Sequence, residues 1–180
     1  MWQAASTRSS KHRFKSITTM SQHTADCTHP KHHVHDATAC MQAVKAACLQ
    51  KGLRFTPIRE QVMQLVAVHG KPIKAYDLLE QMKAKVGANA PPTVYRALDF
   101  LLEHGFIHKL SSINAFVACH HPSIEHSVPF LICAGCQSAI ELEDESIAND
   151  LNQKAQMLGF KPRAQVLEVH GLCKICVNKK

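Results

Sequence analysis

The sequence has no long apolar run, which argues against a membrane protein. None of its apolar stretches approaches the roughly 18 residues that a membrane-spanning helix requires. Residues 1–19 contain basic side chains but no apolar segment follows them, so the usual pattern of a secretory signal is missing. We therefore expect a soluble, cytoplasmic chain with no membrane contact. In such a chain, eight cysteines indicate thiolate and metal chemistry rather than disulfides.

Acidic side chains are scarce in the N-terminal part of the chain. Residues 1–105 hold 14 Lys and Arg against 7 Asp and Glu, whereas residues 106–180 hold 7 against 7. The whole formal net charge of +7 therefore lies in the first part. This asymmetry favours a polyanionic partner, and nucleic acid is the usual one, although a solubilising basic surface would give the same count.

Residues 1–38 have few large apolar residues and no periodic pattern, which predicts a disordered tail. Met20 opens a chain as plausibly as Met1 does, so it could be the true start. Histidines are frequent between His29 and His35 and could bind metal loosely. A solvated tail without a specific site is the favoured interpretation.

Four helices are predicted after the tail. In the first, apolar residues recur at helical spacing, and because Cys40 and Cys48 lie on that stripe, packing is their expected role. The second begins where Thr56 serves as an N-cap and a proline follows. The third and fourth are expected over residues 74–86 and 91–104.

The fourth helix leaves polar side chains on or near its outer face in its first two turns. Short helices that end in one with exposed, hydrogen-bonding residues near its N-terminus are typical of a helix-turn-helix. Residues 106–110 and 115–119 then alternate like two strands around a Ser-Ser-Ile-Asn turn, which predicts a wing. The expected unit is a winged-helix DNA-binding domain over residues 39–119. Its outward polar residues are Thr93, Tyr95, Arg96 and Asp99.

The remaining residues predict a small α/β unit. Strands are expected over residues 128–132, 138–143 and 163–169, with a helix between the last two. A link over residues 120–127 would join this unit, residues 128–180, to the winged helix. The fold class of the whole chain is α+β. Because so small a unit buries little core, a metal site and dimerisation would both stabilise it.

Two Cys-x-x-Cys pairs lie in this unit, Cys133 with Cys136 and Cys173 with Cys176. Four thiolates at about 2.3 Å form a closed tetrahedral zinc site with no open position for chemistry. The gap between the pairs exceeds that of a usual zinc ribbon but can hold a helix and a strand. Two redox pairs are the alternative, and the βαβ pattern that they need is absent.

A second group of candidate ligands mixes chemical types: His108, Cys119, His126 and Glu141. Two neutral imidazoles, one thiolate and one carboxylate would neutralise Zn²⁺ and should hold it less permanently than four thiolates, as a sensor requires. The members come from the wing, the link and the C-terminal unit. On spacing alone, neighbouring histidines at 120 and 121 could replace His126.

Four segments carry a family resemblance: TPIREQV at 56–62, PPTVYRALDFLLEHGFIHK at 91–109, HSVPFLICAGC at 126–136 and GLCKIC at 171–176. Through them, roughly residues 39–177 resemble the ferric uptake regulator family, and within it the zinc uptake regulator branch. The iron-sensing branch has a His-His-x-His cluster where this chain has EHSVPF, which weakens an iron-sensing interpretation.

The resemblance implies a homodimeric repressor with a winged helix and a dimerisation domain. It would bind AT-rich palindromic double-stranded DNA when loaded with metal, control zinc uptake genes, and have no small-molecule substrate. The family implies two Zn²⁺ per chain, one structural on the four cysteines and one regulatory on the second group, with His126 favoured over its neighbours. It also implies DNA contacts from Tyr76, Tyr95 and Arg96, to which the helix position adds Thr93.

Other functions would fit parts of the sequence. A relative in the same family could sense iron, manganese or peroxide. A zinc buffer or chaperone would suit the histidine-rich tail, but it would need neither the recognition helix nor the basic excess. A zinc enzyme such as a nucleobase deaminase would need an upstream His-x-Glu and an open zinc position, and the sequence predicts neither. No catalytic residues are therefore expected.

Overall fold

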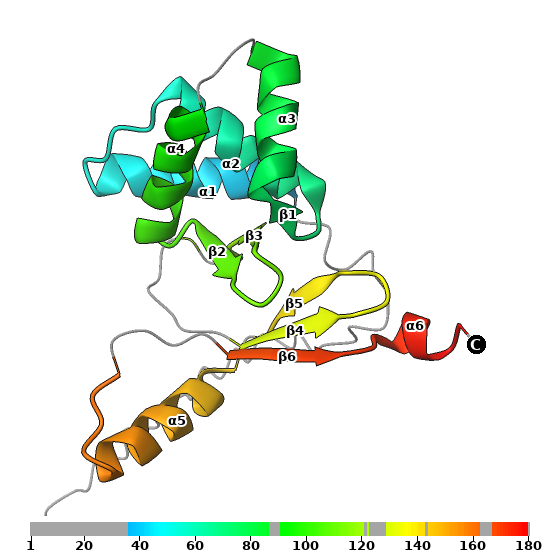
Figure 1. The fold of residues 1–180 in the computed structure, drawn as a ribbon. Helices are drawn as coiled ribbons and strands as arrows, with labels where there is room; N and C mark the ends of the chain where they lie inside the picture. The colour runs from blue at the N-terminus through cyan, green and yellow to red at the C-terminus, as the bar shows by residue number, and fades with distance from the viewer. Residues whose placement is uncertain are drawn as a thin grey trace, which may run out of the picture.

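The computed structural model describes residues 36–86, 91–120, 122, 129–142, 144–162 and 167–179. Four helices form the N-terminal part: the first packs on the second, and the other three pack on a three-stranded sheet. A second three-stranded sheet lies beyond the first (Figure 1). The predicted α+β class is therefore confirmed. The predicted tail up to residue 35 lies outside the described residues. Within the described part, no helix is both long and apolar enough to cross a bilayer.

The first helix begins two residues earlier than the sequence predicts. The carboxylate of Asp36 accepts hydrogen bonds from the backbone N–H groups of Thr38, at 2.9 Å, and Ala39, at 3.3 Å. This N-cap satisfies two of the free donors of the first turn, so the last two residues assigned to the tail are helical. The four helices are α1 (Ala37–Gln50), α2 (Pro57–His69), α3 (Ala75–Val86) and α4 (Pro91–Glu103).

The helices enclose one apolar core. Val62 and Met63 of α2 and Leu98 and Leu101 of α4 are fully buried in it, and Cys48 of α1 is buried there as expected. Glycine at the end of α2, Gly70, has a φ of 64°, a left-handed conformation that stops the helix without steric cost. The buried residues that α2 and α4 contribute to this one core hold the two helices firmly against each other.

The wing is a sheet of three strands rather than a hairpin alone. Its strands are β1 (Ile73–Lys74), β2 (Ile107–Leu110) and β3 (Ala115–Ala118), in the order β1-β3-β2 with antiparallel pairing. All four residues of β3 are buried, so the predicted alternation fails there. The reason is that Phe116 and Ala118 pack in the helical core, whereas Val117 packs against the second sheet.

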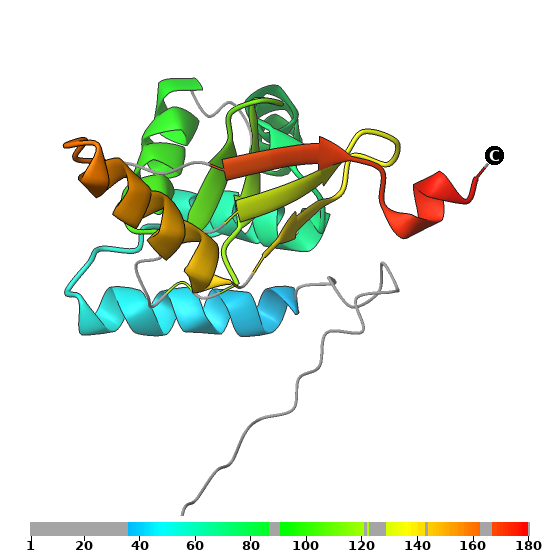
Figure 2. The ribbon, with the colours of Figure 1, turned by 90° about the horizontal axis from the view of Figure 1, so that it is seen from below.

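The second sheet contains β4 (Pro129–Cys133), β5 (Ala139–Glu141) and β6 (Leu167–Gly171), in the order β5-β4-β6. Helix α5 (Glu145–Met157) lies between β5 and β6 in the chain, and the short α6 (Lys174–Val177) follows β6. Strands β4 and β6 run parallel, as the arrows in Figure 2 show. The C-terminal ends of β4 and β6 therefore lie side by side.

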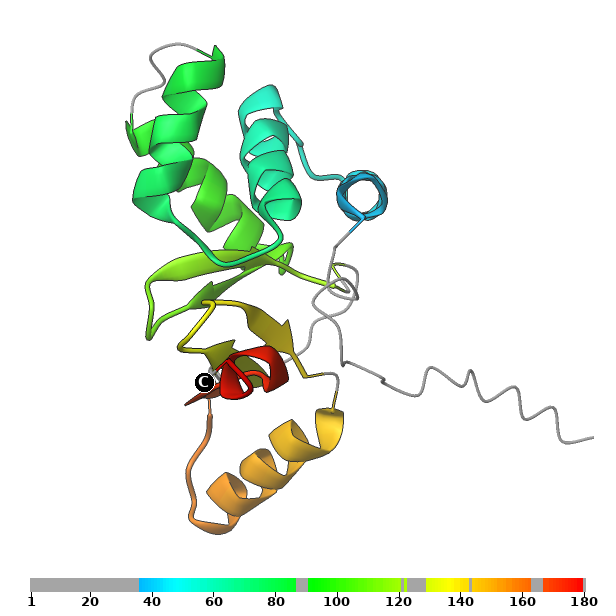
Figure 3. The same ribbon diagram turned by 90° about the vertical axis from the view of Figure 1, so that its right-hand side faces the viewer.

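The two sheets face each other, with α5 beyond the second sheet (Figure 3). A second, small apolar cluster lies between them. It joins Leu110 and Val117 of the wing to Phe130 and Ile132 of β4. This contact places the end of β3 close to β5, where ligands of both sheets can meet.

Candidate metal centres

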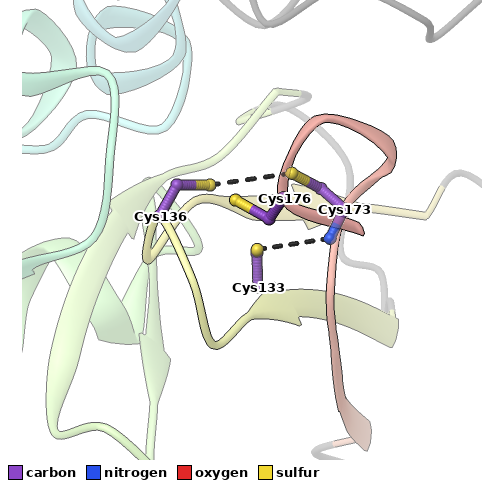
Figure 4. A group of neighbouring side chains, drawn as sticks. All are labelled: Cys133, Cys136, Cys173 and Cys176. Atoms are coloured by element: carbon purple, nitrogen blue, oxygen red, sulfur yellow. Dashed lines mark hydrogen bonds between the residues drawn. The ribbon is translucent and has the colours of Figure 1, made fainter. Parts of the chain in front are cut away.

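The four cysteines of the two pairs lie together at one end of the second sheet. Cys133 ends β4, Cys136 lies in the turn after it, Cys173 caps α6, and Cys176 lies within α6. Their sulfur atoms all lie within 4.8 Å of one another. The Sγ atoms of Cys136 and Cys173 are 3.8 Å apart (Figure 4). Tetrahedral zinc with Zn–S bonds of about 2.3 Å needs sulfurs about 3.8 Å apart, so this group fits the ion.

The parallel pairing of β4 and β6 brings the two cysteine pairs together. Cys133 is in register with Gly171, and the N–H of Ala134 donates to the carbonyl of Gly171 at 2.8 Å. The turn then closes on itself, because the N–H of Gln137 donates to the carbonyl of Cys133 at 2.9 Å. Both pairs are thus held by backbone hydrogen bonds.

Gly135 allows the close approach of the two pairs. A Cβ atom at this position would lie 2.9 Å from the Sγ and 3.0 Å from the Cβ of Cys176. Both distances are shorter than any ordinary contact between such atoms, so a side chain would displace Cys176. This role was not predicted from the sequence, although a glycine inside a Cys-x-x-Cys pair can signal close backbone approach.

Hydrogen bonds in and around this group shift the pKa values of three of its thiols. The backbone N–H of Cys173 donates to Cys133 Sγ at 3.2 Å and, with other N–H groups, lowers the pKa of Cys133 to about 6. The Ser138 hydroxyl, 3.1 Å from Cys136 Sγ, lowers the pKa of Cys136. Interactions with the neighbouring thiols, chiefly with Cys173, raise the pKa of Cys176 to about 12. Four thiolates would repel one another here, and a divalent cation would remove that repulsion.

A second group brings together ligands of the wing and the second sheet. His108 lies on β2, Cys119 directly follows β3, and Glu141 ends β5. One ligand atom from each lies within 4.8 Å of the others. Both Cys119 and Glu141 are buried, and the ring of His108 lies 5.2 Å from that of Phe130 between centroids.

The buried carboxylate of Glu141 gives this second group its chemical character. Its Oε1 lies 3.8 Å from Nε2 of His108, and its Oε2 accepts a hydrogen bond from the N–H of His120 at 3.3 Å. A buried carboxylate is costly unless positive charge or donors balance it. A cation held by imidazole, thiolate and carboxylate would supply that charge, so the donor set fits zinc.

Three of the four predicted members of the second group therefore lie together. The predicted fourth ligand, His126, and its alternative His121 lie outside the described residues. The other alternative, His120, contacts Glu141 through its backbone. The structure consequently leaves the fourth ligand as a prediction.

The predicted DNA-contacting residues are all exposed. Thr93, Tyr95 and Arg96 lie on the outer face of α4, and Tyr76 lies on α3 with 67% of its surface accessible. The opposite face of α4 is anchored in the core. These four side chains can therefore meet a partner without any change in the core.

A helix with one exposed face next to a wing, together with two groups of side chains that can bind a metal, defines a winged-helix protein of the metal-responsive kind. The sequence pattern of the Ferric uptake regulator family matches residues 50–170, and the chain belongs to that family. The resemblance predicted from the sequence is therefore confirmed.

Relatives named as zinc uptake regulators are similar to most of the chain. The zinc uptake regulation protein of Escherichia coli K12 is 41% identical over 132 residues, which cover 73% of this chain and 77% of that protein. The solved structure of holo XcZur is 58% identical, with a TM-score of 0.73 over 77% of this chain and 97% of that one. A zinc uptake regulator in complex with zinc and DNA is 38% identical, with a TM-score of 0.75 over 79% and 95% of the two chains.

Proposed function

We propose that this chain is a zinc-responsive transcriptional repressor that binds an AT-rich palindromic operator as a homodimer and controls zinc uptake genes. One observation carries the proposal: ligands from the wing and from the second sheet meet within 4.8 Å. The similarity to zinc uptake regulators, one of them solved with zinc and DNA, supports zinc as the metal and DNA as the partner. A repressor acts on its operator in the cytoplasm and needs no catalytic residues, so we propose neither an exported protein nor an enzyme.

We infer two zinc ions per chain, one for each ligand group. The four cysteines would hold a structural ion, because they close all four positions. His108, Cys119 and Glu141, together with the undescribed His126, would hold the regulatory ion. When bound, that ion would supply bonds that join the wing to the second sheet.

The winged-helix unit would respond as one body. His108 and Cys119 move with the wing, whose strand β3 is packed against the helical core, whereas Glu141 moves with β5. Joining the three ligands therefore fixes α4 relative to the second sheet. In a homodimer this sets the separation of the two α4 helices, and only one half-site spacing is then matched.

The exposed residues of α4 and α3 would make the DNA contacts. We propose Arg96, Tyr95 and Thr93 for the major groove and Tyr76 for a further contact with DNA. The regulatory metal need not touch DNA in this scheme. By linkage, operator DNA must raise the affinity for zinc by the same factor as zinc raises the affinity for the operator.

The test combines operator affinity, with zinc added or chelated, and zinc content by native mass spectrometry. Cys119→Ser should keep one zinc and the dimer but lose the zinc-dependent gain in affinity, and Glu141→Ala should lose less because water can occupy an oxygen position. Cys40→Ser makes the same chemical change outside both groups and should behave as the unmodified chain. If Cys119→Ser still responds to zinc, the proposal fails. The same assay with Fe²⁺ or Mn²⁺ in place of zinc determines which metal raises the operator affinity.

A further inference from the structure

The wing contacts the second sheet at a point other than the candidate regulatory metal site. The carboxylate of Glu168, on β6, accepts hydrogen bonds from the turn between β2 and β3. The backbone N–H of Ser111 donates to Oε1 at 2.7 Å, and that of Ser112 donates to Oε2 at 3.1 Å. The hydroxyl of Ser112 also donates to Oε2. Three donors of one turn thus converge on one carboxylate.

The strand register places this carboxylate in the same row as a proposed metal ligand. Phe130 on the central strand β4 is in register with Glu141 on one side and with Glu168 on the other. Neighbouring strands lie about 4.8 Å apart, so the two glutamates stand about 10 Å apart across the sheet. Between them Phe130 packs against the wing.

On the wing, the two attachment points lie toward opposite ends of the hairpin. Cys119 directly follows β3, whereas Ser111 and Ser112 form the turn that precedes it. A body held at one point can still rotate about it, but a body held at two separated points has lost most of that freedom. The turn faces the second sheet, and three of its donors bond to Glu168.

The three donors that converge on Glu168 favour the ionised form of its carboxyl group. Partial burial raises its pKa, but the hydrogen bonds from Ser112 and Ser111, together with the electrostatic attraction of His170, outweigh burial and lower the pKa. Hydrogen bonds to a charged acceptor are stronger than neutral ones, although solvent at this half-buried site reduces their contribution.

We propose that Glu168 is a positioning residue, a second attachment point that orients the winged-helix unit on the second sheet without metal. The inference rests on the proposed function, since orientation matters only if zinc selects one arrangement for DNA. With the turn already held, metal binding has to restrict less motion. The apparent zinc affinity is therefore higher than the ligands alone would give.

The first test is a zinc titration of operator binding with the full-length chain. Glu168→Gln keeps the shape but removes the charge, and it should raise the free zinc needed for half-maximal binding about three- to tenfold. Operator affinity at saturating zinc and the zinc content of the four-cysteine site should stay unchanged. Asp150→Asn removes the same charge from an exposed position on α5 and should shift nothing.

A second readout does not depend on DNA. In the zinc-depleted chain, the amides of Ser111 and Ser112 should exchange with solvent faster in Glu168→Gln than in Asp150→Asn, as followed by NMR. Ser112→Ala should shift the zinc midpoint in the same direction. The double variant Ser112→Ala/Glu168→Gln should show no further shift of the zinc midpoint, because both substitutions affect the same interaction.

Two negative results are distinguishable. If the unmodified chain binds the operator equally with and without zinc, the proposed function is wrong. If it responds to zinc but Glu168→Gln and Ser112→Ala match it in zinc midpoint and amide exchange, the second attachment point is wrong and the proposed function stands.

Discussion

Gly135→Ala provides a sharp test of the four-cysteine centre. The added Cβ would lie 2.9 Å from Cys176 Sγ, whereas ordinary contacts begin at 3.4 Å, so the sulfur would have to retreat by 3.4 minus 2.9, or 0.5 Å. Metal–ligand distances tolerate changes of only about 0.2 Å. The crowding should therefore strain the metal site rather than be absorbed by a flexible side chain.

The expected loss follows from the cost of overpacking. Inserting a methyl group into a well-packed region costs about 1–3 kcal/mol. At about 1.4 kcal/mol per tenfold change, this lowers zinc affinity about five- to 150-fold. Competition with a chelator of known affinity measures the loss, and the thermal unfolding midpoint of the zinc-loaded chain should fall with it.

Gly171→Ala is the matched control. Gly171 lies at the end of the neighbouring strand, and a Cβ there would meet nothing within 4 Å. Its zinc affinity should equal that of the unmodified chain. If Gly135→Ala also retains zinc with unchanged affinity and unfolding midpoint, close approach of the two cysteine pairs is not what the glycine provides.

Three further predictions concern other parts of the chain. Arg96→Ala should cost about 1–3 kcal/mol of operator binding and relax the preference at one base pair per half-site, whereas an equal loss on all sequences would make Arg96 a phosphate contact. Deleting residues 1–35, which keeps the Asp36 cap, should leave the zinc midpoint of operator binding unchanged. A large shift of this zinc midpoint would indicate that the tail binds zinc and passes it to the regulatory site. In metal-free chain, absorbance near 240 nm should show one thiolate that forms as the pH rises through about 6 and is absent in Cys133→Ser, because the pKa of Cys133 is lowered. A spectrum without change between pH 5 and 7 would contradict this assignment.

Local signals predicted the elements that depend on neighbouring residues. Thr56 and the following proline marked the start of α2, and Gly70 its end. The spacing of the cysteine pairs predicted the four-thiol group because both pairs are short local motifs at strand ends. The start of α1 was missed by two residues, although Asp36 carried an ordinary capping signal.

The features that the sequence did not predict depend on contacts between residues far apart in the chain. Strand β1 has two residues, too few for any periodic pattern, and exists because it pairs with β3. The residues of β3 are buried because the strand lies between two apolar cores, one on each of its faces. Each core is made by residues far apart in the sequence, so no local pattern predicts this burial. The contact between Glu168 and Ser112 spans 56 residues, and neither residue is unusual in its local sequence.

The small apolar cluster between the two sheets determines how easily the chain could change its arrangement. Separation would expose Leu110, Val117, Phe130 and Ile132, whereas the helical core would remain intact on the far side of β3. Burying one aliphatic side chain stabilises by about 1.5–3 kcal/mol, and here the burial is shared between the partners. The whole contact is thus worth on the order of a few kcal/mol, similar to the difference in affinity by which a ligand biases two states. A contact of this strength would keep both arrangements accessible, so under the proposed function a single bound ion would be enough to select one of them.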